Sequence, residues 1–160
     1  MLHNHTAGTL PGTLAWGLAA LVGVGLAPRA AHAALGAPYA SIATDQSRLA
    51  ASIKVTPRSS YEVHELTLAS GTLVREYASN GGAVFAVAWN GPTMPNLQQA
   101  LGGYFANYAA AATAKHGGHN HLTVQQDDLV IQAGGHMRAF TGRAYLPQAI
   151  PAGVSIDELR

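Results

Sequence analysis

Three short runs of β-forming residues, separated by turn residues, constrain the fold of this chain most. The runs are YEVHELTL, TLVREYAS and AVFAVAWN, within residues 61–90, and each is rich in Val, Leu, Tyr, Phe or Thr. Their separators, centred on ASG and NGG, contain residues that tolerate the positive φ of tight turns. Because connections this short reverse the chain direction, the sequence predicts three consecutive antiparallel strands.

The third run predicts a central strand, because its alternation places apolar side chains on both faces. By period two, one face would receive Val84, Ala86 and Ala88, and the other Phe85, Val87 and Trp89. The two preceding runs carry more charge, which fits strands nearer the edge of the sheet.

A helix is predicted after the third strand. Asn96 stands at the N-cap position with Gln99 three residues on, and apolar residues then recur at helical spacing to about Lys115. Gly102 and Gly103 each disfavour a helix by about 1 kcal/mol relative to Ala, so we expect a kink or a close backbone contact there.

Two further strand-like runs follow, at residues 122–133 and 136–145, with Gly134 and Gly135 between them. The order β-β-β-α-β-β predicts an α+β fold, an antiparallel sheet of about five strands with one helix packed on one face. We expect a flexible N-terminal arm at residues 34–60, the α+β domain at 61–147 and a C-terminal tail at 148–160.

The first 33 residues have the features of a cleavable secretion signal. LAWGLAALVGVGLA, residues 14–27, is uncharged and shorter than the roughly 20 residues that span a bilayer. Pro28 follows it, and Ala31, His32 and Ala33 supply the small-x-small cleavage pattern. Although no Lys or Arg precedes the apolar run, we expect export to the periplasm or secretion, and no membrane span after cleavage.

Composition excludes several classes of function. The chain has no cysteine, so disulfides, thiolate nucleophiles and thiolate metal sites are impossible. Its nine Lys and Arg residues oppose eight Asp and Glu, and Arg29 leaves with the signal. Because the mature chain is then balanced and its basic residues are scattered, we expect no nucleic-acid binding.

The histidines of KHGGHNH, residues 115–121, form the first candidate site. His116, His119 and His121 could bind Zn, Ni or Cu through neutral ring nitrogens. A Gly-Gly loop leaves ligand geometry unfixed, however, so we predict no cofactor.

The second candidate site lies on the last predicted strand. Alternation places His136 and Arg138 on one face, suited to an anion, and Met137 and Ala139 on the other, facing the helix. A solvated sheet face, or cross-strand pairing with a glutamate, is the competing interpretation.

Catalytic motifs are missing from the sequence. GxSxG, HExxH, a P-loop and a strand-to-helix GxGxxG do not occur, and no spacing links Ser70, His64 and Asp127. Enzymatic activity is therefore unsupported.

The segments TLASGTLVREY, VFAVAWNGPTMPNL and GGHMRAFTGRAYLP, behind a signal that ends in AHAALGA, resemble the DUF2844 family of small exported proteobacterial proteins of unknown function. The resemblance covers almost all of the mature chain and brings no assigned activity. It directs attention to His136, Arg138, Arg143 and Trp89 as ligand-binding residues, because the segments that carry the resemblance contain them.

Two hypotheses of function follow. The first is a non-enzymatic periplasmic or secreted protein that binds another envelope or extracellular component. The second is a metal-binding or hydrolytic periplasmic protein built around the histidines. Stoichiometric metal in tag-free protein, lost when His116, His119 and His121 are replaced together, would favour the second hypothesis.

Export makes the first testable prediction. Protein recovered from the periplasm should begin at Ala34 or within about two residues of it, because the peptidase cuts after the small-x-small pattern. Intact-mass measurement reads the terminus directly, and retention of Met1 would contradict the prediction.

Overall fold

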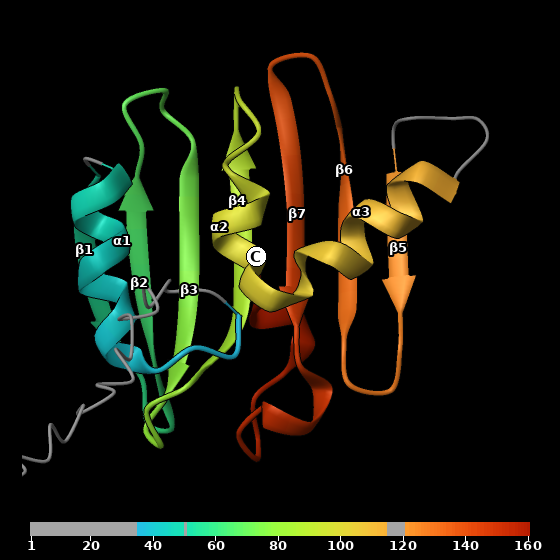
Figure 1. Ribbon diagram of the computed structural model, residues 1–160. Helices are drawn as coiled ribbons and strands as arrows, with labels where there is room; N and C mark the ends of the chain where they lie inside the picture. Colours follow the sequence, from blue (N-terminus) through green and yellow to red (C-terminus); the bar gives the residue numbers. More distant parts are fainter. Residues whose placement is uncertain (1–34, 50, 115–120) are drawn as a thin grey trace, which may run out of the picture.

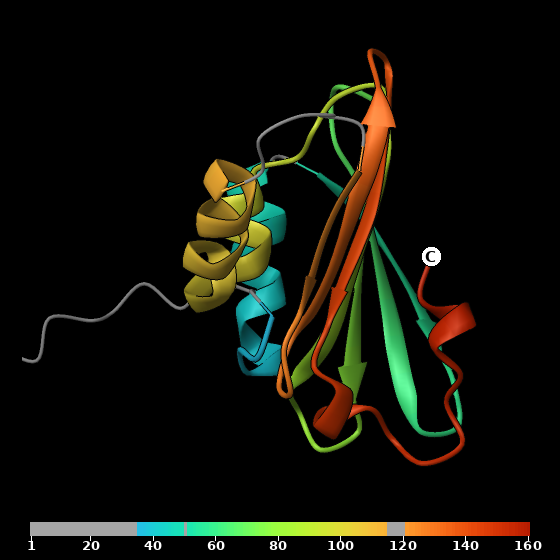
Figure 2. The ribbon, with the colours of Figure 1, turned by 90° about the vertical axis from the view of Figure 1, so that its right-hand side faces the viewer.

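The fold is one antiparallel sheet with helices on one face and the C-terminal segment on the other (Figures 1 and 2). The computed structural model describes residues 35–49, 51–114 and 121–160. Its seven strands stand in the order β1-β2-β3-β4-β7-β6-β5. They are β1 (Ser52–Pro57), β2 (Tyr61–Thr67), β3 (Leu73–Ser79), β4 (Val84–Gly91), β5 (His121–Gln125), β6 (Val130–His136) and β7 (Ala139–Tyr145). The predicted signal segment lies outside the described residues.

The predicted antiparallel strands of residues 61–90 are confirmed as β2, β3 and β4. Gly71 and Gly82 lie in the turns that join them, with φ of 81° and 86°. β4 lies in the middle of the sheet and is buried on both faces, as its two-sided apolar pattern predicts.

The prediction of five strands is wrong, because the sheet has seven. Within the predicted flexible arm, residues 39–57 form a 3-10 turn (Tyr39–Ser41), α1 (Ile42–Leu49) and the edge strand β1. The predicted strand at 122–133 is divided into β5 and β6 by a turn that contains Asp127 and Asp128. Both carboxylates are exposed at the turn. In a continuous strand the two side chains would point to opposite faces of the sheet, so both could not remain in water.

The predicted break at Gly134 and Gly135 is also wrong, since both lie within β6. The reversal comes at Met137 and Arg138, between the paired residues His136 and Ala139. Arg138 adopts φ 68°, and a Cβ on Gly135 would lie 2.2 Å from the Ala139 carbonyl oxygen. Met137 is 84% exposed, so the expectation that it faces the helix fails.

The helical layer covers one face of the sheet. Asn96 caps α2 (Leu97–Leu101), as predicted, by accepting a hydrogen bond from the Gln99 amide. The predicted interruption at the glycines is confirmed, because a 3-10 turn (Gly102–Tyr104) separates α2 from α3 (Phe105–Ala114). Ile42 of α1 and Leu101 of α2 are buried in the core on this face. No helix in the described ranges is long and apolar enough to cross a membrane.

A β-bulge changes the predicted faces of β4. The pairing register with β3 shifts between Tyr77 and Ala78. As a result Val84 packs with Val87 and Trp89 in the helix-side core, while Phe85 joins Ala86 and Ala88 on the opposite face. Strict alternation would have placed Val84 and Phe85 the other way round.

The second face receives the end of the chain (Figure 2). After β7 the chain forms two 3-10 turns, Pro147–Ala149 and Ile156–Glu158. Leu159 is fully buried there in a second, smaller core with Tyr61, Tyr77 and Phe85. The C-terminal tail therefore forms part of the domain.

Trp89 and Gly142 lie in close contact between β4 and β7. They are register partners, and Trp89 is 2% exposed. A Cβ on Gly142 would lie 2.2 Å from Cζ2 of Trp89, a separation that real Cβ atoms do not show. The indole therefore lies directly over the glycine, on the helix side of the sheet.

Substitution of Gly142 tests this packing. Gly142→Ala should lower the free energy of unfolding by about 1 to 3 kcal/mol, because the new methyl group must displace the indole. Gly103→Ala is the matched control, since its Cβ would have no neighbour within 4 Å. Denaturant melts that show equal stability for the two variants would contradict the packing.

Candidate functional site

A hollow on the helix-free face of the sheet is the best-formed candidate site. We call it the sheet hollow. It has a volume of about 1130 Å³ and is lined by all seven strands and by the end of the chain. Its polar lining includes Asn90, Thr123, Gln132 and Thr141. These side chains offer hydrogen-bond donors and acceptors to a ligand.

The lining concentrates positive charge. Of the Lys and Arg residues that the structure describes, five line the sheet hollow, namely Lys54, Arg58, Arg75, Arg143 and Arg160. Of the eight Asp and Glu residues only Glu65 and Glu158 line it. A chain with nearly balanced charge therefore presents a locally cationic surface.

Two arginines hold the C-terminal segment, residues 155–160, against the sheet. Nη1 of Arg143 donates to the main-chain oxygen of Ile156 at 2.8 Å and to that of Leu159 at 3.5 Å. Nη1 of Arg75 donates to the main-chain oxygen of Arg160 at 2.8 Å. Each guanidinium is also held by a neighbour on the sheet, because Nε of Arg143 donates to Gln132 and Nε of Arg75 donates to Glu65, at 2.8 and 2.7 Å.

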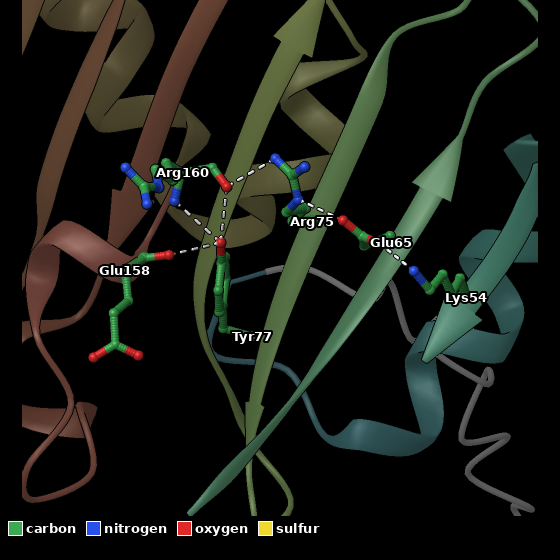
Figure 3. Close-up of polar contacts among 6 residues, drawn as sticks. All are labelled: Lys54, Glu65, Arg75, Tyr77, Glu158 and Arg160. Atoms are coloured by element: carbon green, nitrogen blue, oxygen red, sulfur yellow. Dashed lines mark hydrogen bonds and ion pairs between the residues drawn. The ribbon is translucent and has the colours of Figure 1, made fainter. Parts of the chain in front are cut away.

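Tyr77 completes the attachment (Figure 3). Its hydroxyl lies 3.0 Å from both the amide nitrogen and the main-chain oxygen of Arg160, and 3.3 Å from the main-chain oxygen of Glu158. The amide donates to the hydroxyl, which can donate to either carbonyl oxygen. Burial raises the pKa of Tyr77, so the hydroxyl keeps its proton at neutral pH.

The Glu158 carboxylate accepts one hydrogen bond from β2 and another from within the C-terminal segment. Tyr61 donates to Oε2 of Glu158 at 2.8 Å, and this hydrogen bond is the main cause of the lowered pKa of that carboxyl. Its Oε1 accepts from the amide of Ser155 at 3.2 Å, while the Ser155 hydroxyl accepts from the amide of Asp157. This capping box folds the 3-10 turn immediately before Leu159.

Leu159 occupies a socket between aromatic rings, which we call the Leu159 socket. Leu159 is 0% exposed and belongs to the same buried apolar cluster as Tyr61, Val63, Tyr77 and Phe85. The ring centroids of Tyr61 and Tyr77 lie 5.9 and 6.2 Å from that of Phe85. Contacts of this kind make a rigid apolar recess beside the cationic lining.

The predicted ligand-binding residues are separated in space. Arg143 lines the sheet hollow, and Trp89 borders it, although the indole packs into the helix-side core. His136 and Arg138 are exposed at the β6–β7 hairpin and do not line the hollow. The structure therefore does not bring these four residues together in one site.

The histidine site is only partly described. His121 begins β5 and lines the sheet hollow, while His116 and His119 lie outside the described residues. In the part of the chain that the structure describes, no cluster of three His, Cys, Asp or Glu residues could hold a metal ion.

His64, Ser70 and Asp127 are not joined by any hydrogen bond. His64 is buried on the helix side, with Nε2 3.3 Å from Oε2 of Glu62. Its burial lowers the pKa of the imidazole, and Glu62 partly opposes this shift. The Ser70 hydroxyl instead accepts a hydrogen bond from the Thr93 hydroxyl, and Asp127 is exposed in the β5–β6 turn. The arrangement is not a catalytic triad.

Comparison with known proteins identifies the family. The model of the family described as "Protein of unknown function (DUF2844)" matches residues 31–159. The chain belongs to the DUF2844 family. The comparisons found no significant match among curated proteins or among solved structures.

Sequence reasoning missed four residues that shape this DUF2844 site: Tyr61, Arg75, Tyr77 and Leu159. Alternation along β3 does place Arg75 and Tyr77 on one face. A capping-box pattern, Ser155 with Glu158, also marks an ordered turn before Leu159. Neither pattern shows that β3 and the C-terminal segment are in contact. Only the folded structure of this DUF2844 chain shows that contact.

The anchoring role of Arg143 is testable. Arg143→Gln should weaken the attachment of the C-terminal segment by about 1 kcal/mol, because it removes charged hydrogen bonds to main-chain oxygens. Hydrogen exchange measured by mass spectrometry should then be faster in residues 155–160. Arg138→Gln removes the same charge from the exposed hairpin and should leave this exchange unchanged. Equal protection in both variants would contradict the assigned contacts.

Proposed function

We propose that this DUF2844 protein is an exported, non-enzymatic binding protein that recognises an anionic segment of an envelope or extracellular partner in the sheet hollow. The observation that carries the proposal is the charge of the side chains in the lining, where five cationic side chains stand against two acidic ones. Long-range attraction to such a surface favours an anionic partner over a neutral one.

Two of the cations are well placed to meet a ligand. The side chain of Lys54 is 77% exposed and lies 3.9 Å from Oε2 of Glu65, a contact that leaves most of the ammonium group in solvent. Arg58 is exposed at the end of β1. Both residues line the sheet hollow, and the hydrogen bonds that hold the C-terminal segment come from other side chains, although Arg58 is close enough to Glu158 to contribute to the lowered pKa of that carboxyl.

Binding, not catalysis, is proposed because of the chemistry of the lining. Amides, hydroxyls, guanidinium groups and tyrosines suit recognition through hydrogen bonds. Ser70 and His64 do not line the sheet hollow, and they are held by other contacts. Export is supported by the apolar run at residues 14–27 and the following AHA pattern.

Charge variants test the proposal with a fluorescein-labelled hexaglutamate peptide as the probe. The wild-type chain should bind it, and Lys54→Gln combined with Arg58→Gln should weaken binding by about fivefold or more, measured by anisotropy at low ionic strength. A labelled hexalysine peptide controls for nonspecific attachment.

The matched variant is Arg138→Gln, which removes a cation from the β6–β7 hairpin and should leave hexaglutamate binding unchanged. If hexaglutamate binds no better than hexalysine, or if Arg138→Gln weakens binding as much as the double variant, the sheet hollow is not the anion site.

A further inference from the structure

We propose that the Leu159 socket, together with Arg75, Tyr77 and Arg143, is a peptide-binding groove that the chain's own C-terminal segment occupies in cis. A peptide with an acidic residue followed by leucine, folded into the same 3-10 turn as residues 156–158, binds the same groove in trans. This inference rests on the proposed function and deepens it, because it makes the anionic partner a polypeptide and names the residues that select it.

The sheet binds the C-terminal segment mainly through hydrogen bonds to the main-chain oxygens of the segment. Arg143 donates to the main-chain oxygens of Ile156 and Leu159. Arg75 donates to the oxygen of Arg160, and Tyr77 reaches the oxygens of Glu158 and Arg160. Any peptide in the same conformation presents these oxygens, so this part of recognition does not depend on the sequence of the peptide.

Two side chains of the segment supply selectivity. Leu159 is 0% exposed in its socket, and Glu158 accepts a hydrogen bond from Tyr61 through one carboxylate oxygen. Ile156, Asp157, Glu158 and Arg160 are exposed, and among them Glu158 is the one whose side chain accepts a hydrogen bond from the sheet. A competing peptide therefore needs an acidic residue followed by leucine, and tolerates variation at the flanking positions.

The segment is attached in a way that permits exchange. Among the described residues, the ladders of the sheet join β1 to β7, and the one isolated bridge joins Pro38 to Ala83, so no ladder includes residues 155–160. Release of the segment would break side-chain contacts but no strand pairing. It would also expose the aromatic socket and free the Nη1 groups of Arg75 and Arg143 for a partner.

The test uses the full chain and a labelled peptide, VSIDELR, which is the sequence of residues 154–160. Leu159→Ala empties the socket of its own occupant, so this variant should bind the peptide about tenfold or more tightly than the wild-type chain does. A control peptide with alanine in place of its leucine should bind the variant at least about tenfold more weakly than VSIDELR. Adding Arg143→Gln to the variant should reduce VSIDELR binding.

A second variant protects the test against misfolding of the first. Ser155→Ala with Glu158→Gln removes the capping box and weakens the Tyr61 contact without leaving a cavity, and it should also gain VSIDELR binding over wild type. Circular dichroism checks folding, and saturating peptide should raise the thermal midpoint of either variant because a ligand stabilises the state that it binds.

The result that overturns the inference is a folded variant that binds VSIDELR and the alanine peptide equally, or binds neither. The C-terminal segment would then be ordinary structural packing. Failure of this kind is distinguishable from failure of the proposed function, because the hexaglutamate assay on the wild-type chain depends on Lys54 and Arg58 and not on the socket.

Discussion

The burial of β4 on both faces is the constraint on which the rest of the structure depends. Residues Val84 to Trp89 are all buried, so the middle of the sheet needs cover on two sides. Helices α1, α2 and α3 cover the side of Val84, Val87 and Trp89 (Figure 1). No second layer of helices or strands lies against the other side in the described ranges. There the cover over Phe85 comes from the end of the chain, through Leu159 (Figure 2).

The incomplete cover explains why a hollow exists on the helix-free face of the sheet. Ala86 and Ala88 are buried beside Phe85 on this face, and the part of β4 that lines the space of the hollow is Trp89 and Asn90. Longer polar side chains on the neighbouring strands, among them Arg75 and Arg143, surround that space. The same arginines bind the main chain of the C-terminal segment, so structural attachment and proposed recognition use one set of donors.

Local chemistry made much of the fold predictable, whereas long-range register did not. Asn96 and Gly102 set the start and the break of the helical layer through contacts within a few residues, and the turns at Gly71 and Gly82 are equally local. The edge strand SIKVTP escaped notice because it is short, half of its residues are polar and it ends in proline, features that exposed edge strands often have. The Met137–Arg138 reversal escaped notice because the glycines before it gave a stronger turn signal. Arg75 meets Arg160 across 85 positions of sequence, a contact that no local pattern encodes.

The central claim is that the helix-free face of the sheet receives an anionic polypeptide, and mapping by nuclear magnetic resonance tests it most directly. A titration of isotope-labelled chain with an unlabelled peptide of alternating glutamate and leucine should perturb amides around the sheet hollow, including Arg75, Asn90 and Arg143, and those of residues 155–160. Amides of α2 and α3, on the opposite side of the sheet, should change little (Figure 2). Perturbations concentrated on α2 and α3, or spread evenly over both faces, would contradict the account.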